Sequence, residues 1–143
     1  AADHQEVYDP LKRVTPDSPF RFTWEWQQKQ LDAAKDDPDG FFGRRITIDT
    51  STMPTIGINV HRWKAGFRSR PQRSTAHQIF LVMQGSGTTL IDGEPINWSF
   101  GDTFAIPTWK RIEHHAADDA VVMGMTDEPL MRFCKFWKFE ALN

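Results

Sequence analysis

Short strands divided by Gly and Asp turns fill residues 70–109 and constrain the fold of the whole chain. An apolar run at residues 78–84 (QIFLVMQ) ends at the turn Gly85-Ser86-Gly87. A second turn follows at Asp92-Gly93, and the stretch closes with GDTFAIPTW at residues 101–109. Strands separated by turn residues at this spacing predict a small β-barrel or sandwich.

Composition limits the classes of protein to which the chain can belong. Its 143 residues fit one domain, and an apolar content of 39% is enough for one core. A net charge of -2 gives no general attraction to nucleic acid or to an anionic membrane. No apolar run approaches the ~20 residues of a membrane span, and no secretory signal is visible. The single cysteine, Cys134, fits a reducing compartment, so a cytoplasmic location is expected.

The chain before the central stretch divides into an arm and a helix. Residues 1–19 contain three prolines with charges between them and are expected to form an extended arm or linker, with one domain over residues 20–143. Thr23 is a candidate N-cap for a helix over residues 24–35, which the DDPDG segment at residues 36–40 ends. This helix is expected to cap the end of the barrel. Because the chain begins without Met, we expect it to be processed, tagged or a fragment of a longer protein.

Further strands are expected on both sides of the central stretch. They cover residues 41–49, as an edge strand, then residues 56–60, 120–125 and 131–139. His61 falls at the turn that ends the second of these strands. Cys134 lies among apolar neighbours in the last one and is expected to be a small core residue.

The central stretch resembles the paired motifs of the cupin superfamily, and most closely the second cupin of the gentisate, 1-hydroxy-2-naphthoate and salicylate dioxygenases. That resemblance implies an all-β jelly-roll barrel (a double-stranded β-helix). The first motif carries His-x-His, a Glu ten residues later, and Gly; the second carries Gly-Asp-x-x-x-x-Pro and a His five residues beyond the Pro. The glycine, aspartate and proline of the second motif are present as Gly101, Asp102 and Pro107. The four metal-ligand positions hold other residues: Gln72, Ser74, Gln84 and Ile112.

These four residues argue against a metal at the usual cupin position. Iron and manganese sites need neutral imidazoles and carboxylates, whereas amides and a hydroxyl are weak ligands and Ile112 offers none. No metal and no catalytic residue is therefore expected on this chain. A relocated site at His77 and His114 is the alternative, although strand alternation points His77 outward and would need a bulge to turn it inward. His115 is expected to point away from His114.

Cationic and aromatic residues near the mouth of the barrel form a candidate site for a small aromatic acid, because an arginine fork matches a carboxylate. The candidates are Arg68, Arg70, Arg73, Trp98, Trp109, Arg111 and His114. The alternatives are a solvated rim paired with nearby acids and tryptophans that simply pack. The barrel interior is expected to be shrunken and partly filled, with an open pocket as the second hypothesis.

Three functions follow from these observations. The first is a metal-free cupin with a structural or oligomerisation role beside a separate cupin that holds Fe(II), which the resemblance implies for a full-length relative. The second is a stand-alone cupin that binds a small anionic aromatic ligand. The third is an enzyme with the relocated metal. Assembly into a homodimer or homotetramer, or with a second cupin domain or chain, is expected for the first two.

Overall fold

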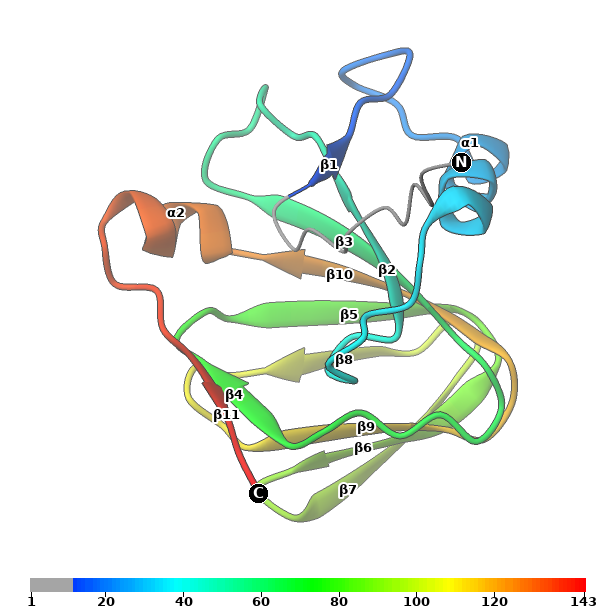
Figure 1. Ribbon diagram of the computed structural model, residues 1–143, viewed down its shortest axis with the longest axis vertical. Helices are drawn as coiled ribbons and strands as arrows, with labels where there is room; N and C mark the ends of the chain where they lie inside the picture. Colours follow the sequence, from blue (N-terminus) through cyan, green and yellow to red (C-terminus); the bar gives the residue numbers. More distant parts are fainter. Residues whose placement is uncertain (1–11) are drawn as a thin grey trace, which may run out of the picture.

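Two β-sheets face each other and enclose the interior of the protein (Figure 1). The structure is a computed structural model that describes residues 12–143. One sheet has six strands, in the spatial order β1 (Arg13–Val14), β2 (Arg44–Ile48), β3 (Gly57–Trp63), β10 (Ala120–Thr126), β5 (Gln78–Gln84) and β8 (Thr103–Ile106). The other has five, in the order β11 (Phe139–Ala141), β4 (Gln72–Ser74), β9 (Ile112–Ala116), β6 (Ser86–Ile91) and β7 (Glu94–Ser99). The all-β barrel expected from the sequence is confirmed.

Strands β1 to β3 are consecutive in one sheet, and after β3 the chain crosses repeatedly between the two sheets. Several neighbouring strands, such as β3 with β10 and β4 with β9, therefore come from distant parts of the sequence. Every strand pair is antiparallel except β1 with β2, which run parallel. The edge strand predicted for residues 41–49 corresponds to β2, which is shorter. It is not an edge strand, because β1 pairs with its other side. The arm predicted for residues 1–19 falls largely on residues 1–11, which lie outside the described part of the chain.

Two apolar clusters stabilise the sheets. The first fills one end of the space between the sheets and includes Trp63, Phe80 and Trp98. The second lies on the outer face of the six-stranded sheet and includes Leu31, Ile46 and Val60. Alternation along β3 supplies both clusters, since Val60 faces outward and Trp63 faces inward. One sheet thus has a packed layer on each side.

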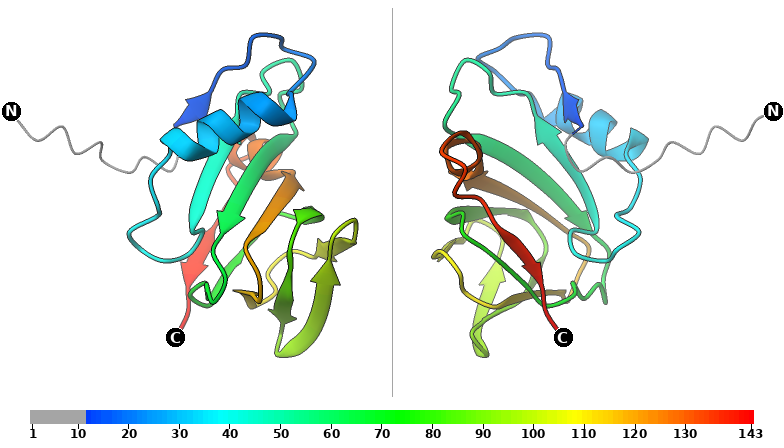
Figure 2. Two further views of the ribbon diagram at one scale, coloured as in Figure 1. Left: turned by 90° about the vertical axis from the view of Figure 1, so that its right-hand side faces the viewer. Right: turned by 60° about the vertical axis from the view of Figure 1, so that its left-hand side comes forward.

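Helix α1 (Trp24–Ala33) covers the outer face of the six-stranded sheet. It contacts β2 and β3 and lies across them in Figure 2. The predicted N-cap is confirmed, because the Thr23 hydroxyl accepts the Trp26 backbone N–H at 3.2 Å. The predicted position at the end of the barrel is wrong. The buried residues of the helix are Gln27 and Leu31, which lie four positions apart, whereas Trp24 at its start is 38% exposed.

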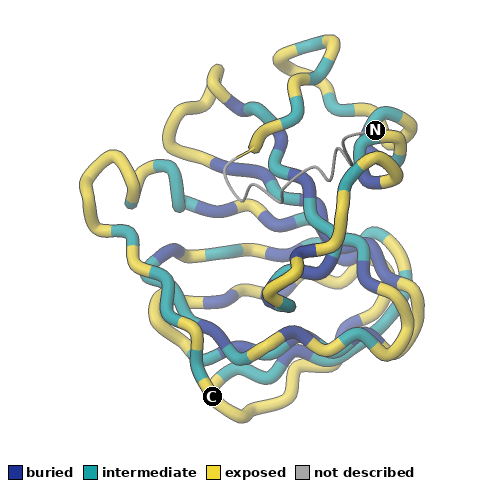
Figure 3. Tube along the Cα trace, viewed as in Figure 1, coloured by how far each residue is buried: buried dark blue, intermediate teal, exposed yellow. Residues whose placement is uncertain are grey.

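The segment after β10 is a second helix, α2 (Glu128–Phe133), and not the long strand predicted for residues 131–139. Pro129 occupies the first turn of this helix, where its missing N–H removes no hydrogen bond. Cys134 is the C-cap and is exposed, so the expectation of a core cysteine is wrong. Figure 3 shows α2 and the following turn as a mostly exposed projection. Only β11 remains of the predicted strand, and it pairs with β4.

Neither helix of the described residues is long and apolar enough to cross a membrane.

Candidate functional site

A cavity of about 480 Å³ opens between the two sheets at the end away from the packed core. Strands of both sheets form its walls, and the loop at residues 37–42, helix α2 and Trp137 border it. The lining includes the side chains of Arg45, Asn59, His61, Gln72, Ser74, Gln78, Phe80, Ile112, His114, Thr126 and Phe139. The volume is in the range of small-molecule sites in proteins. The core fills one end of the interior, but the other end is an open pocket, which was the second hypothesis, and not the shrunken, partly filled pocket expected first.

Strand pairing places the polar lining residues beside one another. His61 on β3 stands directly opposite Arg45 on β2. Gln78 on β5 stands opposite Thr126 on β10. Because directly paired residues of an antiparallel ladder point to the same face, each pair presents two side chains to the interior.

Three of the four positions predicted to have lost metal ligands lie together on the cavity wall. Gln72 and Ile112 are cross-strand partners in β4 and β9, and Ser74 follows on the same face of β4. Sequence counting thus brought three of the four positions to one wall, from motifs about forty residues apart.

Gln84 is the exception, and its predicted position inside the barrel is wrong. The pairing of β5 with β10 shifts register between Val121 and Val122, so that Met83 has no partner. This bulge reverses the alternation, which puts Gln84 on the side of Val121 in the outer cluster, where it is exposed. Gln78, at the other end of the same strand, lines the cavity instead.

The Gln72 amide connects the cavity wall to the loop at its mouth. Its Nε2 group donates to the carbonyl oxygens of Phe41 at 2.9 Å and Arg70 at 3.2 Å. The neighbouring carbonyl of Phe42 accepts from the Trp63 indole at 2.9 Å and lies 3.3 Å from Nδ1 of His61. Interior polar side chains thus hold residues 41 and 42 in place.

Two histidines, His61 and His114, lie inside the barrel. Their rings border the same Phe80 ring, at centroid distances of 5.8 and 5.4 Å. Burial is the main cause that lowers the pKa of His61 well below its ordinary value, with Arg45 and His114 adding to it. Burial, followed by the neighbouring His115, lowers the pKa of His114 to about 3. Both imidazoles are therefore neutral at physiological pH.

The structure does not bring the proposed relocated metal ligands together. The side chain of His77 is 55% exposed outside the cavity, where Nδ1 pairs with Asp127 Oδ2 at 2.8 Å. His114 is buried inside, and its Nδ1 lies 2.8 Å from the hydroxyl of Thr89. His115 points away from His114, as alternation predicted, and contacts Glu113. A shared site at His77 and His114 is thus contradicted.

The residues present do not fit an iron centre. The cluster at Gln72, Ser74, Gln78 and Ile112 offers neither imidazole nor carboxylate. Within residues 12–143, no three His, Cys, Asp or Glu side chains are grouped so that they could hold a metal ion. The carboxylate of Asp37 borders the cavity, but it accepts the backbone N–H groups of Asp39, Phe41 and Phe42.

The predicted ligand-binding residues are mostly elsewhere. Arg73 and His114 border the cavity, and Arg73 pairs with Glu140 at 2.8 Å. Arg70 lies over the Phe41 ring at 4.5 Å, and Arg111 pairs with Glu113 at 2.9 Å. Arg68 forms a backbone bridge with His115. These last three arginines are not among the residues that line the cavity.

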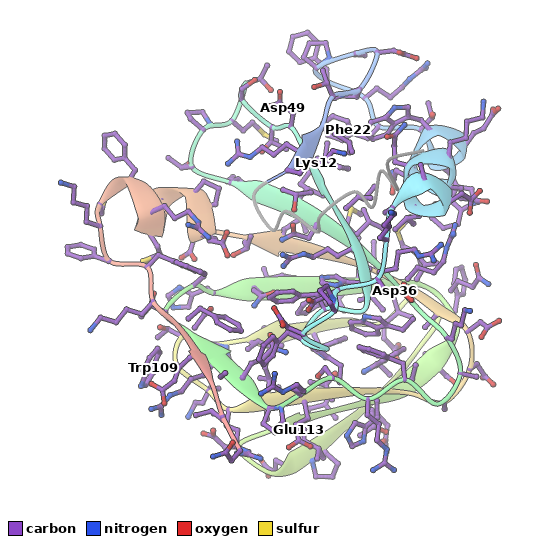
Figure 4. The ribbon with its side chains drawn as sticks, viewed as in Figure 1. Lys12, Phe22, Asp36, Asp49, Trp109 and Glu113 are labelled. Atoms are coloured by element: carbon purple, nitrogen blue, oxygen red, sulfur yellow. The ribbon has the colours of Figure 1, made fainter. Side chains whose placement is uncertain are left out.

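Neither of the two predicted tryptophans lines the cavity. Trp98 is 3% exposed and belongs to the core between the sheets, which was the packing alternative. Trp109 lies on the outside of the barrel beside β4 and β11 (Figure 4), where the Arg73 guanidinium stacks on its ring at 4.3 Å.

Sequence reasoning missed several cavity residues. The sequence places His61 at a turn, whereas strand β3 continues through it to Trp63. Extending the predicted strand past Val60 puts His61 on the face opposite Ile58 and Val60, which is the inner face. The aromatic mouth, formed by Phe41, Phe139 and Trp137, had no comparable local signal.

Comparison with known proteins places the fold among ring-cleaving dioxygenases. No family model matches the chain. It is 29% identical over 126 residues to gentisate 1,2 dioxygenase 1 of Aquipseudomonas alcaligenes, covering 83% of this chain and 36% of that protein. It is 29% identical over 150 residues to 5-aminosalicylate 1,2-dioxygenase of a Comamonas species, covering 96% of this chain and 40% of the relative. A gentisate 1,2-dioxygenase of a Haloferax species is 30% identical over 134 residues, covering 87% of this chain and 34% of the relative.

Among solved structures, salicylate 1,2-dioxygenase from Pseudoaminobacter salicylatoxidans superposes with a TM-score of 0.75 at 21% identity. The superposition covers 84% of this chain and 36% of that chain. The chain therefore spans well under half the length of the curated relatives that it matches, at 34% to 40% of each.

Proposed function

We propose that this chain, which has a cupin fold and is related to the gentisate, salicylate and 1-hydroxy-2-naphthoate 1,2-dioxygenases, is the cupin of such an assembly that holds no iron. Its role is structural: it supports a separate cupin domain or chain that carries Fe(II), and it contributes contacts between subunits. The domain comprises residues 20–143 together with β1, whose residues Arg13 and Val14 belong to the six-stranded sheet.

One observation carries the proposal. Gln72 and Ile112 face each other across β4 and β9 at the positions where the family motifs place two histidines. The geometry of a former ligand cluster is kept while its donors are gone. The Gln72 amide instead donates both of its described hydrogen bonds to backbone carbonyls, which is a structural task.

The exposed surface supports a role in assembly. Helix α2 buries none of its residues. Phe133 at its end is 86% exposed and Phe136 in the next turn is 68% exposed. Large apolar side chains gathered at a projection are typical of a contact surface. We assign this projection to contacts with a second copy or with the iron-binding cupin.

Metal analysis with a designed positive control tests the proposal. The native chain is expected to retain no stoichiometric iron or cobalt after exposure to excess metal and desalting. A variant carrying Gln72→His, Ser74→His, Gln78→Glu and Ile112→His is expected to bind Co(II), measured by its visible absorption. A matched control with Gln84→Glu in place of Gln78→Glu lacks the carboxylate on the cavity wall and is expected to bind more weakly. One tightly held iron per native chain would overturn the proposal.

The assembly role is tested separately by sedimentation velocity. Phe133→Ser with Phe136→Ser is expected to reduce the size of the assembly without lowering the unfolding midpoint, since neither ring is buried in the chain itself. Phe20→Ser, at an 83% exposed ring elsewhere on the surface, is the control. An unchanged assembly in the double variant would show that α2 makes no subunit contact.

A further inference from the structure

We propose that the cavity between the sheets binds a small, uncharged aromatic molecule that carries a hydroxyl group, which is the phenol class of ligand. The inference depends on the cavity alone and does not require the function proposed above. It also differs from the aromatic acid expected from the sequence, because the cations expected to hold an acid lie mostly outside the cavity.

The cavity wall is rich in aromatic side chains. Phe80 lines the inner end, where it stacks on Phe104 with ring centroids 5.2 Å apart. At the mouth, Phe41 meets Phe139 edge to face at 5.2 Å, and Trp137 stacks on Phe139 at 6.3 Å. Aromatic walls at both ends of a cavity of about 480 Å³ suit a flat apolar ring.

Hydrogen bonding fixes which nitrogen of His114 carries the proton. The fully buried Thr89 hydroxyl accepts the Trp98 indole N–H at 3.0 Å and lies 2.8 Å from Nδ1 of His114. If Thr89 also accepted from His114, its own buried proton would have no acceptor, which is costly. Thr89 therefore donates to Nδ1, and the proton of neutral His114 is on Nε2. That N–H donor has no partner among the described residues, and His114 lines the cavity.

His61 has the opposite tautomer. Its Nδ1 lies 3.3 Å from the carbonyl oxygen of Phe42, which can only accept, so Nδ1 carries the proton. Nε2 of His61 is then an acceptor. The Oε1 atom of Gln72 is a second acceptor without a hydrogen-bond partner in the described chain, because the amide donates through Nε2. The cavity wall thus offers one donor and two acceptors, and a hydroxyl both donates and accepts.

The charges around the cavity favour a neutral ligand. Asp37, Asp39 and Glu128 balance Arg45, Arg73 and Arg132 among the lining residues. Arg73 pairs with Glu140 and Arg132 pairs with Glu128, and Arg45 lies over the Phe42 ring at 3.7 Å. The imidazoles at the inner end are uncharged. A carboxylate would lose its hydration beside these neutral imidazoles, where the one neighbouring guanidinium named here, that of Arg45, already stacks on the Phe42 ring.

Nuclear magnetic resonance titration of the whole chain with three probes tests the class of ligand. Phenol has the ring and the hydroxyl, toluene has the ring alone, and benzoate has the ring and a negative charge. Phenol at millimolar concentration is expected to shift the side-chain amides of Gln72 and Gln78. Toluene and benzoate are expected to bind roughly tenfold more weakly, the order of one lost hydrogen bond. Benzoate binding as tightly as phenol, toluene binding as tightly as phenol, or shifts confined to residues outside the cavity would each overturn the inference.

A pair of neighbouring histidines supplies matched variants. His114→Phe keeps a ring against Trp63 and removes the donor, so it is expected to abolish the preference for phenol over toluene while toluene still binds. His115→Phe makes the same change on the outer face of the strand and is expected to leave the preference intact. A preference that survives His114→Phe would contradict the inference.

A measurement on the native chain covers the case in which His114→Phe does not fold. Nitrogen-15 chemical shifts of the imidazoles report their tautomers directly. We expect the proton on Nε2 of His114 and on Nδ1 of His61. The reverse assignment at either histidine would remove the donor and acceptor on which the inference depends.

Discussion

His61 stands directly opposite Arg45 across strands β2 and β3, so a buried imidazole faces a guanidinium inside the barrel. Burial first, and then this positive charge, keep the pKa of His61 low. The pKa of His114 is lowered to about 3 by burial and by its neighbour His115.

These two histidines predict that stability falls as the pH falls. In the unfolded chain each histidine titrates near pH ~6.5. Between that value and the lower folded pKa the unfolded state binds more protons, so lowering the pH favours unfolding. Each histidine is expected to add up to about 1.4 kcal/mol per pH unit to the slope of the unfolding free energy against pH. Urea unfolding between pH about 7 and about 5 measures this slope, because most carboxylates titrate below that range.

Two variants separate this effect from other titrations. His114→Phe is expected to reduce the slope, whereas His77→Phe, at the exposed pair with Asp127, is expected to leave most of it. A slope that does not change in His114→Phe would contradict the assignment.

Thr89→Val is expected to destabilise the fold by about 2–4 kcal/mol, because it leaves the Trp98 indole and Nδ1 of His114 without partners in a buried place. Thr88→Val is the matched control on the same strand, where the hydroxyl makes one exposed bond to Asn97. Its expected cost is below about 1 kcal/mol. Equal costs in chemical denaturation would show that the buried hydroxyl has no special role.

Asp37→Ala is expected to cost about 2–3 kcal/mol and to loosen the loop at the mouth of the cavity, since the carboxylate accepts three backbone N–H groups there. Asp36→Ala removes only a surface pair with Arg44 and is expected to cost under about 1 kcal/mol. Hydrogen exchange at residues 39–42 provides the second readout. Unchanged protection of these amides in Asp37→Ala would show that the carboxylate does not hold the loop in place.

Two glycines of the sheets are expected to differ in their tolerance of alanine. A Cβ at Gly87 would lie 2.3 Å from the carbonyl oxygen of His115, which the strand cannot move away. At Gly124 the nearest atom is Cε1 of Phe80 at 2.9 Å, and the ring can shift into the cavity. We expect Gly124→Ala to cost about 1–3 kcal/mol and Gly87→Ala to cost more, by thermal unfolding. The reverse order would mean that the Phe80 ring is held rigidly.

Local patterns in the sequence predicted much of the barrel and part of the site. Alternation placed His114 inside and His115 outside, and the motif spacing brought Gln72 and Ile112 to one wall. These predictions succeeded because alternation and short turns are properties of neighbouring residues.

The failures depend on contacts between distant residues. The bulge at Met83 arises from pairing with β10, so counting along the chain could not reveal that Gln84 turns outward. Likewise, the sequence predicts one strand over residues 131–139, whereas the observed strand, β11, pairs with the distant β4, and Thr75 donates to the carbonyl oxygen of Phe136 in the segment before it. The cavity itself depends on a loop held by hydrogen bonds that span nineteen to thirty-one residues.

Strand β11 is the edge strand that pairs with β4, and its residue Phe139 also lines the cavity. Its loss would bare the hydrogen-bonding groups of β4, which is a known route to aggregation. The same loss would widen the entrance to the interior. A substitution in β11 that alters protection against self-association is therefore expected to alter ligand access to the cavity as well.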